Sequence, residues 1–99
     1  METRRKGKTT PIMLSFECRD LPNLDVMTKT DSFIVLSVFE AGGWVQIGRT
    51  EVIYNSLNPK FSKAIRVEFE FAVDQRLKVE VYHHESKDKE VFIGMILLL

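Results

Sequence analysis

Apolar and polar residues alternate with a period of two along much of this chain, a pattern typical of β-strands with one buried and one solvated face. One stretch, residues 33–39, is instead almost continuously apolar, which favours a central strand covered on both faces. No segment keeps a helical period over three turns. The predicted strands cover residues 11–18, 33–39, 44–54, 65–71, 77–82 and 91–99.

Turn residues separate these segments and set the direction of the chain. Ala41-Gly42-Gly43 supplies the positive φ angles of a hairpin, and the cluster 55–59 ends in Pro59, which a central strand does not accept. Six short strands between turn signals predict an all-β antiparallel sandwich. With strands of alternating direction, we expect the loops at 19–31, 55–61 and 83–90 at one end.

The composition of the chain limits the kinds of molecule that it can bind through charge. The 99 residues carry 14 basic and 14 acidic side chains, so no global field draws the chain to nucleic acid or to an anionic membrane, and any electrostatic partner needs a local patch. We expect a basic flexible tail at 1–10 and one domain at 11–99. The single cysteine, Cys18, excludes a disulfide framework and favours an intracellular compartment. Neither end has the length and apolarity of a membrane span. The tail's basic residues are Arg4, Arg5, Lys6 and Lys8.

The loop between the first two predicted strands carries the candidate chemistry. Asp25 and Asp31 lie six residues apart, with Val26 and Met27 between them. Carboxylates that share a loop tip repel each other unless a cation lies between them, and a hard cation takes such oxygen ligands. The alternative reading is that both are turn-forming or solvated loop residues.

These residues resemble a known family. Leu21-Pro22-Asn23-Leu24-Asp25 with Thr30-Asp31-Ser32-Phe33 is similar to the first calcium-binding loop of C2 domains, and Val81-Tyr82 with Phe92-Ile93-Gly94 is similar to the frame of the third. Gly48-Arg49-Thr50-Glu51-Val52 and Leu57-Asn58-Pro59-Lys60-Phe61-Ser62-Lys63 resemble the first C2 domain of copines more specifically. The resemblance covers about residues 12–94.

The resemblance implies a Greek-key β-sandwich of C2 type that binds anionic phospholipid membranes from the cytoplasm as a peripheral, non-spanning module of membrane trafficking. It implies Ca²⁺ held by Asp25, Asp31 and Glu85, with Val26 and Met27 as the apolar tip that contacts the membrane. The family's usual chain has two C2 domains and a von Willebrand-type A domain. A second reading of the tip is a buried plug under the loop.

Departures from the family pattern weaken the expected metal site. His83 and Val91 stand where the family has aspartate, and Glu85 replaces a third aspartate. Because calcium affinity follows the number of anionic ligands, we expect the calcium dependence to be weakened or lost. Asp88 and Glu90 are alternative ligands if the loop shifts its register.

The family fold has eight strands, whereas this pattern predicts six, so we expect a domain that is incomplete at its C-terminal end. The last predicted strand would then be an unpaired apolar edge. An alternative function is therefore a calcium-independent protein-interaction module that uses the loops or this edge strand.

Two further chemistries find little support in the sequence. No nucleophile elbow, phosphate loop or zinc motif occurs, so we expect a binding module and not an enzyme. His83 and His84 are expected to be partly exposed loop residues, since neighbouring side chains at a strand end point to opposite faces and cannot chelate one ion.

Overall fold

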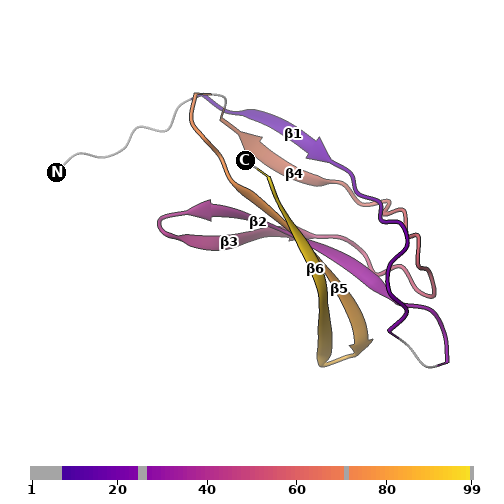
Figure 1. Ribbon diagram of the computed structural model, residues 1–99. Helices are drawn as coiled ribbons and strands as arrows, with labels where there is room; N and C mark the ends of the chain where they lie inside the picture. The colour runs from indigo at the N-terminus through magenta and orange to yellow at the C-terminus, as the bar shows by residue number, and fades with distance from the viewer. Residues whose placement is uncertain (1–7, 25–26, 71, 99) are drawn as a thin grey trace.

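The computed structural model describes residues 8–24, 27–70 and 72–98, and this part of the chain contains six β-strands and no helix (Figure 1). The number of strands and the all-β class confirm the prediction. The strands are β1 (Thr10–Leu14), β2 (Ser32–Glu40), β3 (Gly43–Arg49), β4 (Ile65–Phe69), β5 (Leu77–Ser86) and β6 (Lys89–Leu98).

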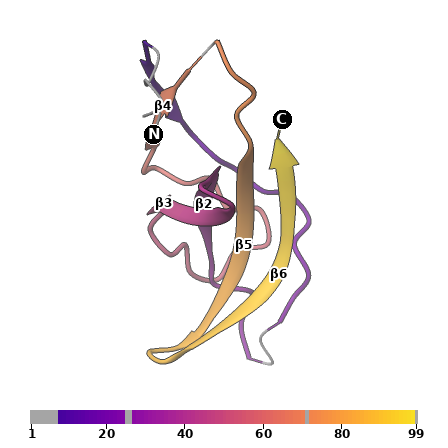
Figure 2. The same cartoon turned by 90° about the vertical axis from the view of Figure 1, so that its left-hand side faces the viewer.

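The strands form two antiparallel sheets. One sheet has two strands, β1 and β4, and the other has four in the order β3-β2-β5-β6. Figure 2 shows that β1 and β4 lie beside β2 and β3, whereas β6 forms the far edge of the larger sheet. Within the described residues, the last part of β6, from Met95 to Leu98, is exposed.

β2 is the centre of the fold, as its continuous apolar run predicts. Its inward residues Ile34, Leu36 and Val38 pack with buried residues of β4 and β5 and with Phe61 to form the core. Its other face is covered by side chains of the neighbouring strands and not by a second sheet. The ring of Tyr82 stacks on that of Phe33 at 5.5 Å between centroids, for example. Both faces of the strand are thus buried.

The β2–β3 hairpin turns as predicted, with one difference in detail. The two positive φ angles occur at Ala41 and Gly42, at 49° and 82°, a pattern that matches the right-handed twist of the flanking strands. Gly43 is instead the first residue of β3.

The third strand is shorter than predicted. β3 ends at Arg49, although we expected a strand to residue 54. The hydroxyl of Thr50 accepts a hydrogen bond from the backbone N–H of Ile34 at 2.8 Å. In a regular ladder this N–H of β2 would donate to a backbone carbonyl of β3 instead. Beyond this point only an isolated bridge between Ser32 and Ile53 continues the pairing with β2.

Two other strand limits differ from the prediction. β1 ends at Leu14, because its register with the segment 60–65 then changes: Leu14 lies opposite Ile65 but Glu17 lies opposite Lys60, which leaves two extra residues in that segment. Residues 16–18 bond with the turn around Pro59. β5 runs to Ser86, so most of the charged segment expected to be a loop is a β-hairpin.

Candidate functional site

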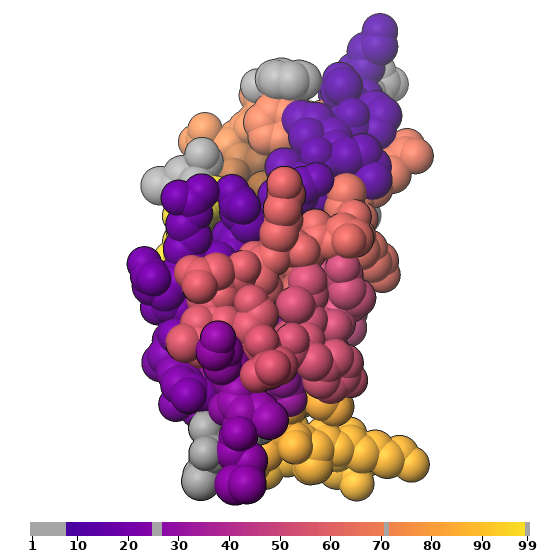
Figure 3. Space-filling model, turned by 90° about the vertical axis from the view of Figure 1, so that its right-hand side faces the viewer, coloured from indigo at the N-terminus to yellow at the C-terminus, as the bar shows by residue number. Residues whose placement is uncertain are grey.

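The three loops that we expected at one end do meet there. The 19–31 loop bonds to the 55–61 turn through backbone hydrogen bonds, from Leu21 N–H to the Leu57 carbonyl at 2.9 Å and from Ser56 N–H to the Thr30 carbonyl at 3.0 Å. The same loop reaches β5, because the N–H of His84 donates to the Asp31 carbonyl at 2.7 Å. Figure 3 shows this end at the bottom of the molecule, where the orange β5–β6 hairpin projects sideways beside the violet loop. We call this part of the molecule the loop end.

His83 ties the loop to the sheet, contrary to our expectation of an exposed loop residue. It lies within β5 opposite Ser32 of β2, and only 1% of its surface is exposed. Its Nδ1 accepts a hydrogen bond from the Asp31 N–H at 3.1 Å. At a position where the resemblance implies a metal-binding aspartate, this chain has a buried histidine that accepts a backbone hydrogen bond.

Asp31 is partly buried, and its carboxylate is used within the protein. Its Oδ1 accepts a hydrogen bond of 2.7 Å from the N–H of Asn55, a residue held at a φ of 58°. The side-chain oxygen of Asn55 in turn accepts the Lys29 N–H at 2.8 Å. These two hydrogen bonds hold the loop against the turn. The first also occupies one carboxylate oxygen of Asp31, which we predicted as a metal ligand.

Thr30 fixes the start of the same loop. It is completely buried, its hydroxyl donates to the Pro22 carbonyl at 2.6 Å, and the same hydroxyl accepts the Leu24 N–H at 3.0 Å. The two arms of the loop are thereby joined at its base.

The segment 48–52 connects β3 to the 55–61 turn. Its contacts explain why glycine and glutamate occur at these positions of the sequence. A Cβ on Gly48 would lie 2.7 Å from Cγ2 of the buried Ile65, so only glycine lets β3 approach β4 this closely. The carboxylate of Glu51 accepts the N–H groups of Ser62 and Lys63, at 2.7 and 3.2 Å. These bonds, chiefly that from Ser62, lower the pKa of Glu51 below the ordinary glutamate value.

The acidic residues of the β5–β6 hairpin are largely paired with cations. Glu85 binds Lys89 at 2.8 Å, and this bond raises the pKa of Lys89 above its ordinary value. Glu90 binds Arg49 at 3.1 Å. Two carboxylates that we considered as metal ligands, Glu85 and Glu90, therefore each take part in a solvent-exposed ion pair.

The predicted site residues have different outcomes. Asp25 and Val26 lie outside the described residues, so their assignments stay predictions, as does the assignment of Glu85 and Asp31 to a metal. Met27 is 88% exposed, which does not fit the alternative of a buried plug. Among the described residues, no three histidine, cysteine, aspartate or glutamate side chains come together in a group that could hold a metal ion.

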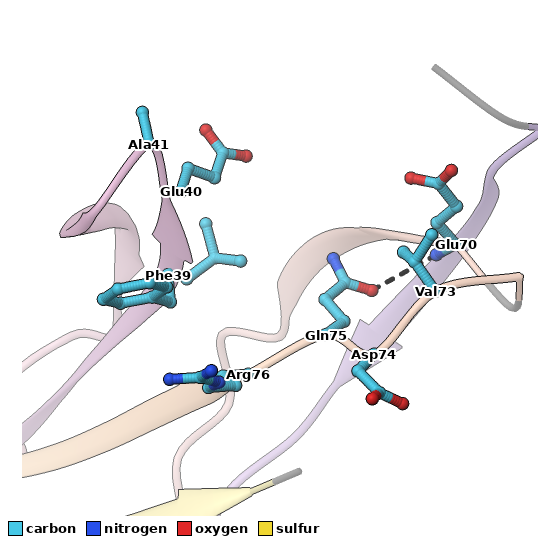
Figure 4. Close-up of a pocket in the computed structure, with 9 residues that line it drawn as sticks. Phe39, Glu40, Ala41, Glu70, Val73, Asp74, Gln75 and Arg76 are labelled. Atoms are coloured by element: carbon cyan, nitrogen blue, oxygen red, sulfur yellow. Dashed lines mark hydrogen bonds between the residues drawn. The ribbon is translucent and has the colours of Figure 1, made fainter. Parts of the chain in front are cut away.

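A hollow of the described surface lies at the opposite end of β2. It is lined by residues from the end of β2 and from the segment 70–76, as Figure 4 shows. There the side chain of Gln75 bridges the Glu70 N–H and the Glu68 carbonyl, and Arg76 lies 5.0 Å above the ring of Phe39. Gln75 and Arg76 are thus engaged in local contacts, and the hollow contains none of the predicted site residues.

Comparison with solved structures supports the fold. The chain aligns with a C2 domain of plant extended synaptotagmin 1 with a TM-score of 0.75 and 21% identity, covering 96% of this chain and 70% of that one. It aligns with BON1-C2B with a TM-score of 0.74 and 28% identity over 92% of this chain and 65% of that one. A human GIVD cytosolic phospholipase A2 matches with a TM-score of 0.72 and 19% identity over 89% of this chain, which spans only 12% of the phospholipase.

A family model agrees with these structural matches. The C2 domain model matches residues 13–98, which is most of the chain and includes every strand except the start of β1. The two sheets, the meeting of the three loops and this match lead to one assignment. The chain belongs to the C2 domain family.

Proposed function

We propose that this chain is a copine-like C2 module that binds anionic phospholipid membranes through its loop end, with calcium dependence that is weakened or lost. C2 domains commonly bind phospholipid membranes, and the described residues contain no helix that could cross one. The observation that carries the proposal is the composition of the loop end, where an almost fully exposed methionine lies two residues from a lysine.

Two lysines of the described loop end can contact an anionic surface without a bridging ion, although Asp31 and Asp88 carry acidic groups at the same end. Lys29 on the loop and Lys87 at the hairpin tip are exposed and take part in no ion pair among the described residues. The hairpin carboxylates Glu85 and Glu90 are paired with cations. A lysine close to an anionic bilayer contributes about 1 kcal/mol of binding free energy.

The proposed weakness of calcium binding follows from the small number of oxygen ligands available at the loop end. Calcium takes six to eight oxygens and its affinity depends on their charge. Of the described candidates, Asp31 already accepts the Asn55 N–H and Glu85 already binds Lys89. A calcium ion would have to compete with both contacts, and His83 offers no carboxylate. We therefore propose Ca²⁺ as a weak ligand of this loop end at most, and we propose a cytoplasmic module that binds without turnover.

Co-sedimentation with vesicles tests this function. Vesicles of phosphatidylcholine with phosphatidylserine should pellet the chain to a similar extent in calcium and in a chelator, whereas vesicles of phosphatidylcholine alone should not. Pelleting that needs calcium would show that the ion switch is intact and contradict the reduced dependence. Absence of pelleting with every vesicle would reject the membrane function and favour a protein-interaction module that uses the same loops or β6.

A further inference from the structure

Tyr54 projects from the loop end into solvent. It lies between β3 and the 55–61 turn, outside the regular strands, and 64% of its surface is exposed. One contact orients its ring, an edge-to-face arrangement with His84 at 6.3 Å between ring centroids. Among the described residues its hydroxyl takes part in no hydrogen bond. The phenol oxygen is therefore accessible to another protein.

The chain has a second tyrosine, Tyr82, and the structure separates the two. The ring of Tyr82 stacks on that of Phe33 at 5.5 Å and meets that of Phe92 edge-to-face at 5.6 Å. Its hydroxyl donates to the Glu80 carboxylate at 3.0 Å. Burial and this carboxylate raise the pKa of Tyr82 above the ordinary tyrosine value. The Tyr82 hydroxyl is thus engaged within the sheet, whereas that of Tyr54 faces solvent.

Phosphoryl transfer to a tyrosine requires a hydroxyl that can enter the active site of a kinase. The phenol oxygen attacks the γ-phosphorus of ATP in line, and an aspartate of the kinase accepts the hydroxyl proton. The bond between the γ-phosphorus and its bridging oxygen breaks, and ADP leaves. Tyr54 meets this requirement in the folded chain, because its ring projects from a loop. Tyr82 would first have to leave its ring stack and its bond to Glu80.

A phosphate on Tyr54 would change the charge of the loop end. It adds a charge of about −1.5 to −2 at pH 7. The side chain of the next residue, Asn55, accepts the N–H of Lys29 at 2.8 Å, so the phosphate would lie on the same part of the surface as Lys29. Because it carries about as much charge as the two lysines Lys29 and Lys87 together, it should cancel their attraction to an anionic bilayer.

We propose that Tyr54 is a phosphorylation site for a protein tyrosine kinase, and that its phosphate lowers the affinity of the loop end for anionic membranes. The site itself rests on the exposure and the free hydroxyl of Tyr54. The effect on affinity rests on the membrane function proposed above, so the two parts are tested separately.

Mass spectrometry after incubation with a broad-specificity tyrosine kinase and Mg-ATP tests the site. The folded chain should take up one phosphate, on Tyr54. Tyr54→Phe should take up none, and the matched control Tyr82→Phe should take up one, as wild type does. Phenylalanine keeps both rings and their contacts, and circular dichroism checks that each variant is folded. A phosphate on Tyr82 of the native chain, or none on Tyr54, would overturn the proposal.

Co-sedimentation with phosphatidylserine-containing vesicles in a chelator tests the effect of the phosphate. The phosphorylated chain should bind about tenfold more weakly than the unmodified chain, and salt should reduce this difference by screening. Kinase-treated Tyr54→Phe should bind as the unmodified chain does. Equal binding of the phosphorylated and unmodified chains would overturn the regulatory part. Failure of the unmodified chain to bind would instead reject the membrane function, and the mapped phosphate would still decide whether Tyr54 is the site.

Discussion

The backbone N–H of Asp31 donates a hydrogen bond to Nδ1 of His83, 52 residues further along the chain, at a distance of 3.1 Å. This bond joins the end of the long loop to the central part of the larger sheet. The next residue strengthens the connection, because the His84 N–H donates to the Asp31 carbonyl. The position of the loop end therefore depends on β5 as much as on the loop itself.

His83→Phe should destabilise the protein. The phenyl ring cannot accept the Asp31 N–H, so a partly buried donor loses its partner, at a cost of about 1–3 kcal/mol in the free energy of unfolding. Urea unfolding followed by circular dichroism measures the change. His84→Phe is the control, since it retains an aromatic ring against Tyr54 and the backbone bond to Asp31, and it should change the stability much less. Equal effects of the two substitutions would show that the Nδ1 contact contributes little.

Glu51 should make stability depend on pH in the acidic range. Its pKa is lower in the folded protein than in the unfolded chain, so its stabilising contribution is present above the ordinary glutamate pKa and is lost as the pH falls through the folded value. Wild type should therefore exceed Glu51→Gln in urea midpoint at pH 7, and the gap should close on acidification. A gap that stays constant with pH would contradict this role of the carboxylate.

Local alternation was sufficient to predict most of the fold. It indicated most of the six strands, the continuous apolar run of 33–39 indicated the central position of β2, and the alternating strand directions indicated that the three loops meet at one end. It overestimated β3, because the Thr50 hydroxyl replaces a backbone carbonyl in the pairing, and no periodic pattern reveals that exchange.

The candidate site was less predictable than the fold. The charged residues that follow His83 indicated a loop, but pairing of β5 with β2 buries His83. The contact between Asp31 and Asn55 depends on a positive φ at Asn55, which a single sequence does not specify. The Asn-Ser pair before Leu57 was a turn signal that could have suggested a side-chain partner for the loop.

The most direct test of the membrane function is the affinity of Met27→Asp for phosphatidylserine vesicles in a chelator. Met27 is 88% exposed at the loop end, and loss of one inserted apolar side chain should weaken binding about tenfold or more. Met13→Asp is the control, because Met13 is 59% exposed on β1, away from the loops, and should bind as wild type does. Our account predicts loss in Met27→Asp alone, and unchanged binding of that variant would contradict it.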